Sequence, residues 1–121
     1  MKPARQEDAR LLTGLGRYTA DLQMPDMLHA FVIRSDQARG CIRQMDLAAV
    51  RAAPGVHMVV TAQELQAWGA RDLPCLVQPP GQRSVPMPVL AQGTVQFVGQ
   101  PLAVVIAESA WAAQDAAELA D

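Results

Sequence analysis

The sequence lacks three features that mark common classes of protein. It has no run of lysine or arginine, and 10 basic residues stand against 12 acidic ones, so it has no basic surface for a nucleic-acid backbone. Its two cysteines, Cys41 and Cys75, form neither a disulfide framework nor a CxxC zinc motif. No apolar stretch approaches the roughly 20 residues of a membrane span. We therefore expect a cytoplasmic protein with no nucleic acid and no membrane as partner.

The sequence also lacks a recognisable catalytic or metal-binding constellation. Gly14 and Gly16 suggest a dinucleotide-binding motif, but Thr19 stands where its third glycine belongs and no strand precedes the pair. Neither histidine, His29 or His57, belongs to an HxH or HxxxH pair. No serine or cysteine lies in a nucleophile elbow or beside a histidine. We predict no catalytic, cofactor-binding or metal-binding residue in this chain.

What the sequence does contain is enough apolar material for one small domain. Half of its 121 residues are hydrophobic and 18% are charged, which predicts a single folded unit. Residues 1–27 are polar and turn-rich, with glycines and Pro25, and predict an extended N-terminal arm with little regular structure. Residues 28–121 predict the domain itself, and we expect it to be truncated at its C-terminal end.

The periodicity of residues 28–121 predicts an α+β fold, a small mixed or antiparallel sheet with short helices packed on it. We expect the strand 28–34 to be largely covered on both faces and to form a hairpin with the next strand. In the third strand, Val56, Met58 and Val60 should share one face. The expected strands are 28–34, 41–45, 56–60, 95–98 and 102–107, and the expected helices are 47–53, a short one beginning after Thr61 and ending near Gly69, and 109–121.

Local capping signals support the three helices. Asp46 and Ser109 can each accept a hydrogen bond from a backbone N–H in the first turn of the helix that follows. Thr61 and Glu64 fit a capping box. In the last helix, alanines share one face and polar residues the other, so we expect this helix to approach the sheet closely.

A proline-rich segment interrupts the domain. Five of the nine prolines lie at positions 74, 79, 80, 86 and 88, which excludes a helix or a central strand there and predicts a long loop. A polar arm and a proline-rich loop on so small a core indicate surfaces built to lie against another molecule. The candidate interface residues are Arg17, Tyr18, Phe97 and Gln100.

Several segments, taken together and in order, resemble one known family. The most specific are the arm motif 5–18 (RQEDARLLTGLGRY), the loop motif 85–91 (VPMPVLA) and the strand motif 95–109 (VQFVGQPLAVVIAES). They resemble the start of the large, molybdenum-binding subunit of the xanthine dehydrogenase, aldehyde oxidase and carbon monoxide dehydrogenase family. The resemblance covers nearly the whole chain.

The resemblance implies the α/β hammerhead domain that opens that subunit. Such enzymes hydroxylate aldehydes or N-heterocycles, or oxidise carbon monoxide, with a molybdopterin cofactor, and pass electrons to 2Fe-2S clusters and often to FAD. The implied partners are the remainder of the molybdenum subunit, an iron–sulfur subunit and an FAD subunit. The family's cofactor-binding segments and active-site glutamate lie downstream of this region, so no catalytic role is carried onto any residue here.

The sequence differs from the family pattern at three places. Pro25-Asp26-Met27 replaces Pro-Gly-Met and Ser35-Asp36-Gln37 replaces Ser-Pro-His, both at turns. Gln100 stands where the family commonly has an acidic residue, so no charged contact is expected there.

Two functional hypotheses follow. In the first, the chain is the N-terminal structural and assembly domain of a molybdopterin-dependent hydroxylase, with no chemistry of its own. In the second, it is a free-standing protein-interaction module with a hammerhead fold. A small independent enzyme is a third, weaker reading, because no convergent polar constellation is present. The resemblance implies a further strand after the last helix, and a chain without it would leave a sheet edge open, so we expect the isolated chain to self-associate.

Overall fold

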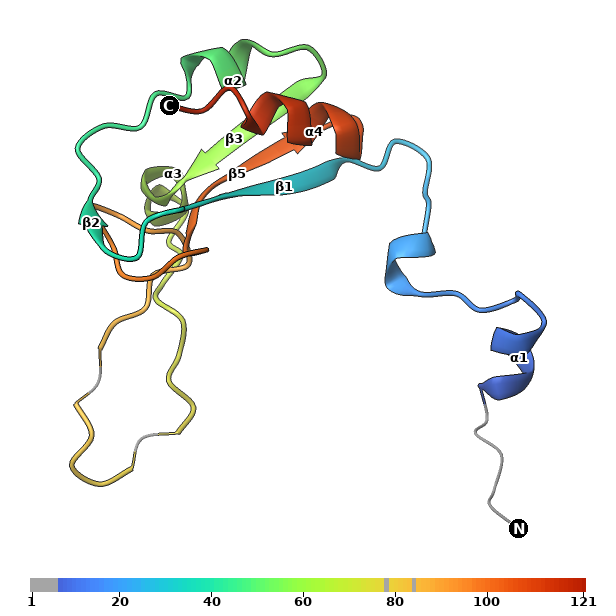
Figure 1. Ribbon diagram of the computed structural model, residues 1–121, viewed down its shortest axis with the longest axis horizontal. Helices are drawn as coiled ribbons and strands as arrows, with labels where there is room; N and C mark the ends of the chain where they lie inside the picture. The colour runs from blue at the N-terminus through green and yellow to red at the C-terminus, as the bar shows by residue number, and fades with distance from the viewer. Residues whose placement is uncertain (1–6, 78, 84) are drawn as a thin grey trace.

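A three-stranded antiparallel sheet forms the body of the computed structural model, which describes residues 7–77, 79–83 and 85–121 (Figure 1). The central strand is β5 (Pro101–Ala107), flanked by β1 (His29–Arg34) and β3 (Val56–Thr61). Pro101 opens β5, the position where its missing N–H does least harm to the ladder. The structure confirms the α+β prediction and shows that the sheet is antiparallel throughout.

A separate two-stranded sheet replaces the hairpin expected between the first two strands. β2 is only Gly40–Cys41, and it pairs with β4 (Thr94–Val95), whereas β1 pairs with β5. The prediction was wrong because Ser35, just after β1, is held by a distant turn. Its N–H donates to the carbonyl of Gln100 and its carbonyl accepts from the N–H of Gly99. The segment after β1 is therefore bonded to the turn that leads into β5 and does not form a hairpin with β1.

A β-bulge at the start of β3 changes which side chains face the core. Val56 lies opposite Ala107, and the next paired residue is Met58, so His57 is the extra residue. Alternation resumes one position late, because a bulge inserts one residue into one strand only. Val59 therefore faces the helices and is 1% exposed. Met58 and Val60 share one face as expected, but the expectation is wrong for Val56, which lies before the bulge and faces the other side with Ala107.

β1 is an edge strand, and the expectation that both its faces are largely covered is also wrong. Ala30 and Phe31 are exposed, and only Val32 and Ile33 in its centre are partly buried. An apolar run predicts a doubly covered strand only when the strand has neighbours on both sides. Here the neighbour on one side is β5 and the other edge has no strand in the described part of the chain.

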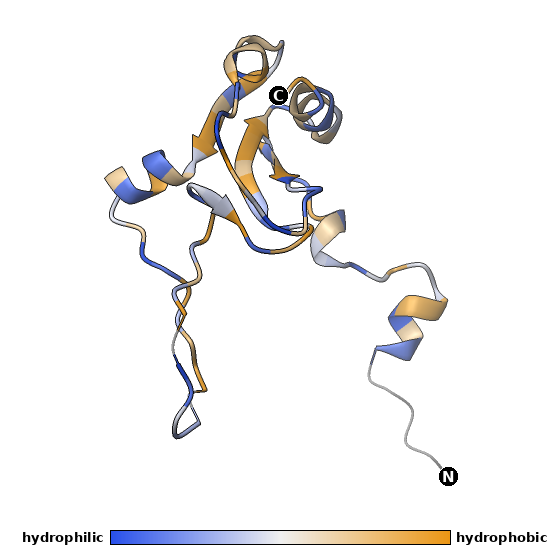
Figure 2. Ribbon diagram, turned by 60° about the vertical axis from the view of Figure 1, so that its left-hand side comes forward, coloured by the Kyte–Doolittle hydropathy of each residue, from blue (hydrophilic) through white to orange (hydrophobic). Residues whose placement is uncertain are grey.

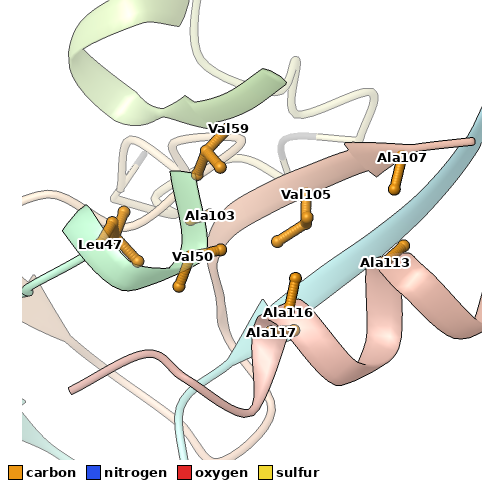
Figure 3. Packing of buried hydrophobic residues seen from close by; sticks show 9 residues of the cluster. All are labelled: Leu47, Val50, Val59, Ala103, Val105, Ala107, Ala113, Ala116 and Ala117. Carbon is orange, nitrogen blue, oxygen red and sulfur yellow. The ribbon is translucent and has the colours of Figure 1, made fainter. Parts of the chain in front are cut away.

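Two helices cover one face of the sheet and form the core with it (Figure 3). They are α2 (Ala48–Ala52) and α4 (Ala110–Ala117). Both capping predictions are confirmed, since Asp46 Oδ1 accepts from Ala48 N at 2.9 Å and Ser109 Oγ from Ala112 N at 3.1 Å. The alanine face of α4 lies on the sheet as predicted. The buried cluster consists of Leu47, Val50, Val59, Ala103, Val105, Ala107, Ala113, Ala116 and Ala117.

The third helix, α3 (Ala62–Ala67), begins directly after β3 through the predicted capping box. Glu64 Oε2 accepts from Thr61 N at 2.9 Å and also from the Thr61 hydroxyl. The helix ends before Gly69, whose φ of 82° lies in the left-handed region that a helix terminus uses. No helix in the described ranges has the length and apolar composition that crossing a membrane demands.

The N-terminal arm contains more regular structure than expected. Its described part includes the helix α1 (Asp8–Leu12) and the 3-10 turn η1 (Thr19–Asp21). Tyr18 N donates to Asp21 Oδ2 at 2.9 Å, which ends the preceding segment and starts η1. Residues 1–6 of the predicted arm lie outside the described residues.

The proline-rich loop projects from the body, as does the arm (Figure 1). The described residues from 70 to 93 contain no helix or strand, as the prolines predicted. The two limbs of the loop are joined by a hydrogen bond from Leu73 N to Met87 O at 2.8 Å. Ser84 and residue 78 lie outside the described residues.

The close packing of α4 on β5 generates a stability prediction. Ala113 is fully buried, so Ala113→Leu would add three carbons where no space exists and should lower the free energy of unfolding by about 1–3 kcal/mol. Gln114→Leu, one residue along on the exposed face, should change it by less than about 0.5 kcal/mol. Urea denaturation of both variants checks this, and equal midpoints would contradict the packing described.

Candidate interaction surface

Large apolar side chains are exposed mainly on the arm and the proline-rich loop. Monomeric proteins rarely expose contiguous apolar surface of this kind unless something else covers it. Figure 2 shows orange, hydrophobic segments along both projections. The exposed residues are Leu11, Leu12, Leu15, Tyr18, Leu22 and Met24 on the arm, and Leu73, Leu76, Val77, Val85, Met87 and Val89 on the loop.

The predicted interface residues Arg17 and Tyr18 lie together on the arm. They line a hollow of about 160 Å³ with Glu7, Arg10 and neighbouring residues of α1. Tyr18 is 65% exposed, so its ring is available to a partner. An exposed tyrosine beside an arginine is a combination that protein interfaces favour.

Phe97 and Gln100 lie elsewhere, on the turn before β5, far from the arm (Figure 1). Phe97 is 39% exposed, but Gln100 is buried, with 3% exposure. Gln100 Oε1 accepts from Gln96 N at 2.7 Å, so its side chain closes the turn that presents Phe97. The structure thus places Gln100 in the interior, where it shapes the turn and offers no surface to a partner.

The same turn is held by two further contacts. Arg34 Nη1 donates to the carbonyl of Gly99 at 2.9 Å, and Gly99 N donates to Ser35 O at 2.7 Å. Gly99 has a φ of 85°, a conformation that favours glycine. The Gly-Gln-Pro sequence before β5 was the available signal for a tight, internally bonded turn.

The structure brings both histidines to one hollow, which the sequence reasoning missed because they lie in different strands. His29 begins β1, His57 is the bulged residue of β3, and Glu108 follows β5. These three residues and the end of the arm line a hollow of about 730 Å³. No group of three histidine, cysteine or acidic side chains among the described residues is placed to hold a metal ion.

A third hollow, of about 480 Å³, lies between residues 42–48, α2, the start of α3 and residues 91–93. Its most ordered contact is the ion pair between Arg51 Nη2 and Glu64 Oε1 at 2.9 Å. Arg51 Nη1 also donates to Val59 O at 3.1 Å, so a single guanidinium connects α2, β3 and α3.

Glu64 is stabilised in its charged form. The hydrogen bond from the Thr61 hydroxyl is the largest cause that lowers the pKa of Glu64 from 4.5 to about 2; burial opposes it, and Arg51 and the Thr61 N–H add to the lowering. Because the pKa is lowered on folding, the carboxylate stabilises the fold above about pH 4.5, and this stabilisation is lost as the pH falls toward 2.

This sign gives a pH-dependent prediction. Glu64→Gln should reduce the free energy of unfolding at pH 7 by about 1 kcal/mol, the usual range for a helix cap and a surface ion pair. The difference from the unsubstituted protein should shrink as the pH is lowered below 4.5 and vanish near 2. Chemical denaturation at several pH values measures it, with Asp115→Asn on the exposed face of α4 as the matched control. A difference that stays constant from pH 7 to 2 would contradict the assigned role.

The described residues do not supply a site for a redox cofactor. Cys41 and Cys75 are free thiols on the surface. The histidine-lined hollow has no metal-holding geometry, and the polar groups of the Glu64 network already satisfy one another. These groups, within the described part of the chain, do not fit a molybdenum cofactor, and we derive no chemical step through one.

The fold is that of a small α+β domain. A thin antiparallel sheet has helices on one face, and two apolar segments project from it. The family model described as "Aldehyde oxidase and xanthine dehydrogenase, a/b hammerhead domain" matches residues 13–121, and the chain belongs to this family.

Known relatives agree in sequence. The chain is similar to the nicotine 6-hydroxylase large subunit of Paenarthrobacter nicotinovorans, with 40% identity over 115 residues, covering 95% of this chain and 14% of the relative. It is similar to the carbon monoxide dehydrogenase large chain of Hydrogenophaga pseudoflava, with 39% identity over 113 residues, covering 93% of this chain and 13% of the relative.

Solved structures agree in fold. Quinoline 2-oxidoreductase from Pseudomonas putida 86 superposes with a TM-score of 0.88 and 41% identity over 97% of this chain and 15% of that one. The Cu,Mo carbon monoxide dehydrogenase superposes with a TM-score of 0.86 and 34% identity, covering 99% of this chain and 14% of that one. The chain thus spans 13–15% of the length of these relatives.

Proposed function

We propose that the chain acts as the N-terminal structural and assembly domain of a molybdopterin-dependent hydroxylase and performs no catalysis by itself. The observation that carries this proposal is the match of residues 13–121 to a domain that makes up about 14% of redox-enzyme large subunits. The exposed apolar residues of the arm and loop support it, because they are surfaces that a larger protein would cover.

The activity and partners of the whole enzyme are part of the same proposal. The substrate is an aldehyde, an N-heterocycle or carbon monoxide, and its pocket and the molybdopterin site are formed by residues outside this chain. The partners are the remainder of the molybdenum subunit, an iron–sulfur subunit with 2Fe-2S clusters, and an FAD subunit. The free, exposed thiols of Cys41 and Cys75 are consistent with the reducing cytoplasm.

A chimeric enzyme tests the proposal. The matched segment of the nicotine 6-hydroxylase large subunit is replaced by this chain, which is 40% identical to it. We expect the chimera to assemble with its other subunits and to hold molybdenum, measured by elemental analysis, and to hydroxylate nicotine.

The chain alone is the control for this experiment. We expect it to bind no stoichiometric molybdenum and to turn over no substrate. Molybdenum or hydroxylase activity in the isolated chain would contradict the assignment. A chimera that folds but never assembles would favour the free-standing interaction module.

The isolated chain should also self-associate. The outer edge of β1 has no partner strand within the described residues, and its central residues are apolar, which is the condition for edge-to-edge pairing. Light scattering across micromolar concentrations should show a mass that rises above the monomer. Phe31→Lys places a charge on this edge strand and should reduce the association, whereas Leu119→Lys, at an exposed position just after α4, should not. A monomer at every concentration would contradict this prediction.

A further inference from the structure

The sheet has a second face that no helix of the described chain covers. α2 and α4 both pack on the face formed by Ala103, Val105 and Ala107 of β5. Residues of β5 between these alternate to the opposite side, because successive side chains of a strand point to opposite faces. We call this opposite side the bare face.

The pairing register identifies the members of the bare face. Directly opposed residues of antiparallel strands project to the same side. Ile106 lies opposite Ala30 of β1 and Met58 of β3, and Val104 lies opposite Val32 and Val60. The bare face therefore consists of Ala30, Val32, Met58, Val60, Leu102, Val104 and Ile106.

Every side chain in this set is apolar. Met58 is 46% exposed and Ala30 is also exposed, while Val32, Leu102, Val104 and Ile106 are only partly buried. Only Val60, where β3 leads into α3, is fully covered. An antiparallel sheet that ends against water carries polar residues on its outer face, and this sheet does not.

The projecting segments extend away from α2. In both views α2 lies at the top of the body, and the proline-rich loop and the arm extend below the body (Figures 1 and 2). Both segments also expose apolar side chains.

We propose that a folded, apolar surface from the remainder of the same large subunit packs against the bare face. This inference rests on the proposed function and names the face through which the domain acts. The chain covers 14% of a relative's large subunit, so most of such a polypeptide is available to fill the face. The absence of charge excludes nucleic acid or a polar ligand as the occupant.

A second copy of this chain is a poorer occupant. A symmetric dimer requires a surface that is complementary to itself. The open edge of β1 already offers such a surface, because two copies of one edge strand can pair with each other. The self-association expected of the isolated chain therefore uses the β1 edge, and the bare face stays open in it.

Oxidative footprinting of side chains tests the inference. Hydroxyl radicals report the solvent exposure of Met58, on the bare face, and of Trp111, which is 75% exposed on the far side of α4. In the chimera with the nicotine 6-hydroxylase large subunit, oxidation of Met58 should fall on the order of tenfold relative to the isolated chain, the change expected when an exposed side chain becomes buried. Trp111 provides the internal reference.

Two variants distinguish the loss of an interface from a loss of folding. Met58→Glu and Trp111→Glu both alter exposed positions, and circular dichroism of the isolated chain should show both folded. In the chimera, Met58→Glu should lower the yield of molybdenum-loaded enzyme on the order of tenfold, because it buries an unpaired charge. Trp111→Glu should lower it less.

The outcomes are distinguishable. A molybdenum-loaded chimera in which Met58 is as reactive as in the isolated chain overturns this inference and leaves the proposed function standing. If oxidation of Met58 in the isolated chain falls as the protein concentration rises, the bare face binds a second copy, and this result also overturns the inference. A chimera that never assembles contradicts the proposed function, and the inference falls with it.

Discussion

The close approach of α4 to the central strand is the constraint on which the rest of the structure depends. Ala113, Ala116 and Ala117 on the helix meet a face of β5 on which Val105 is the largest side chain, between Ala103 and Ala107, so the two layers approach closely. The largest fully buried side chains of the domain are valines. A core of alanine and valine removes little apolar area from water per residue, so the domain has little stability to spare. In the proposed large subunit, burial against the rest of the protein would compensate for this.

The elements whose signals are local could be predicted from the sequence. Thr61 with Glu64, and Ser109, each cap the helix that they were expected to cap, because a cap is decided within three or four residues. Asp46 accepts from the first N–H of α2, but Leu47 is the N-cap of that helix, one residue later than expected. The partner of each strand could not be predicted in this way. β1 pairs with a strand some seventy positions away, and the choice depends on the turn that holds Ser35. Pairing over such distances is a property of the whole fold and leaves no mark on a short window of sequence.

The interaction surfaces were predictable in part. Glycines and prolines predicted an arm and a long loop outside the core, but the exposed apolar residues of the arm were not predicted, because the arm was expected to be polar. Gln100 shows the limit, because a glutamine in a turn looks the same in sequence whether it faces water or closes the turn from within. The bare face was hidden for another reason. Its alternation depends on the bulge at His57, and neither the bulge nor the edge position of β1 has a signature in the residues themselves.

The extra residue in β3 has an evolutionary consequence. At this residue the alternation of side chains between the two faces of the sheet shifts by one position. Val56 before it and Val59 after it therefore face the same side, although they are three positions apart. Substitutions at His57 should change the free energy of unfolding little, because the side chain is exposed and the residue is unpaired in the ladder. Loss of the residue would also leave the ladder intact, because Val56 and Met58 would become consecutive residues opposite Ala107 and Ile106, and the later side chains of β3 would keep their faces. In related chains, the residue here should vary in identity and can be absent without a change of register.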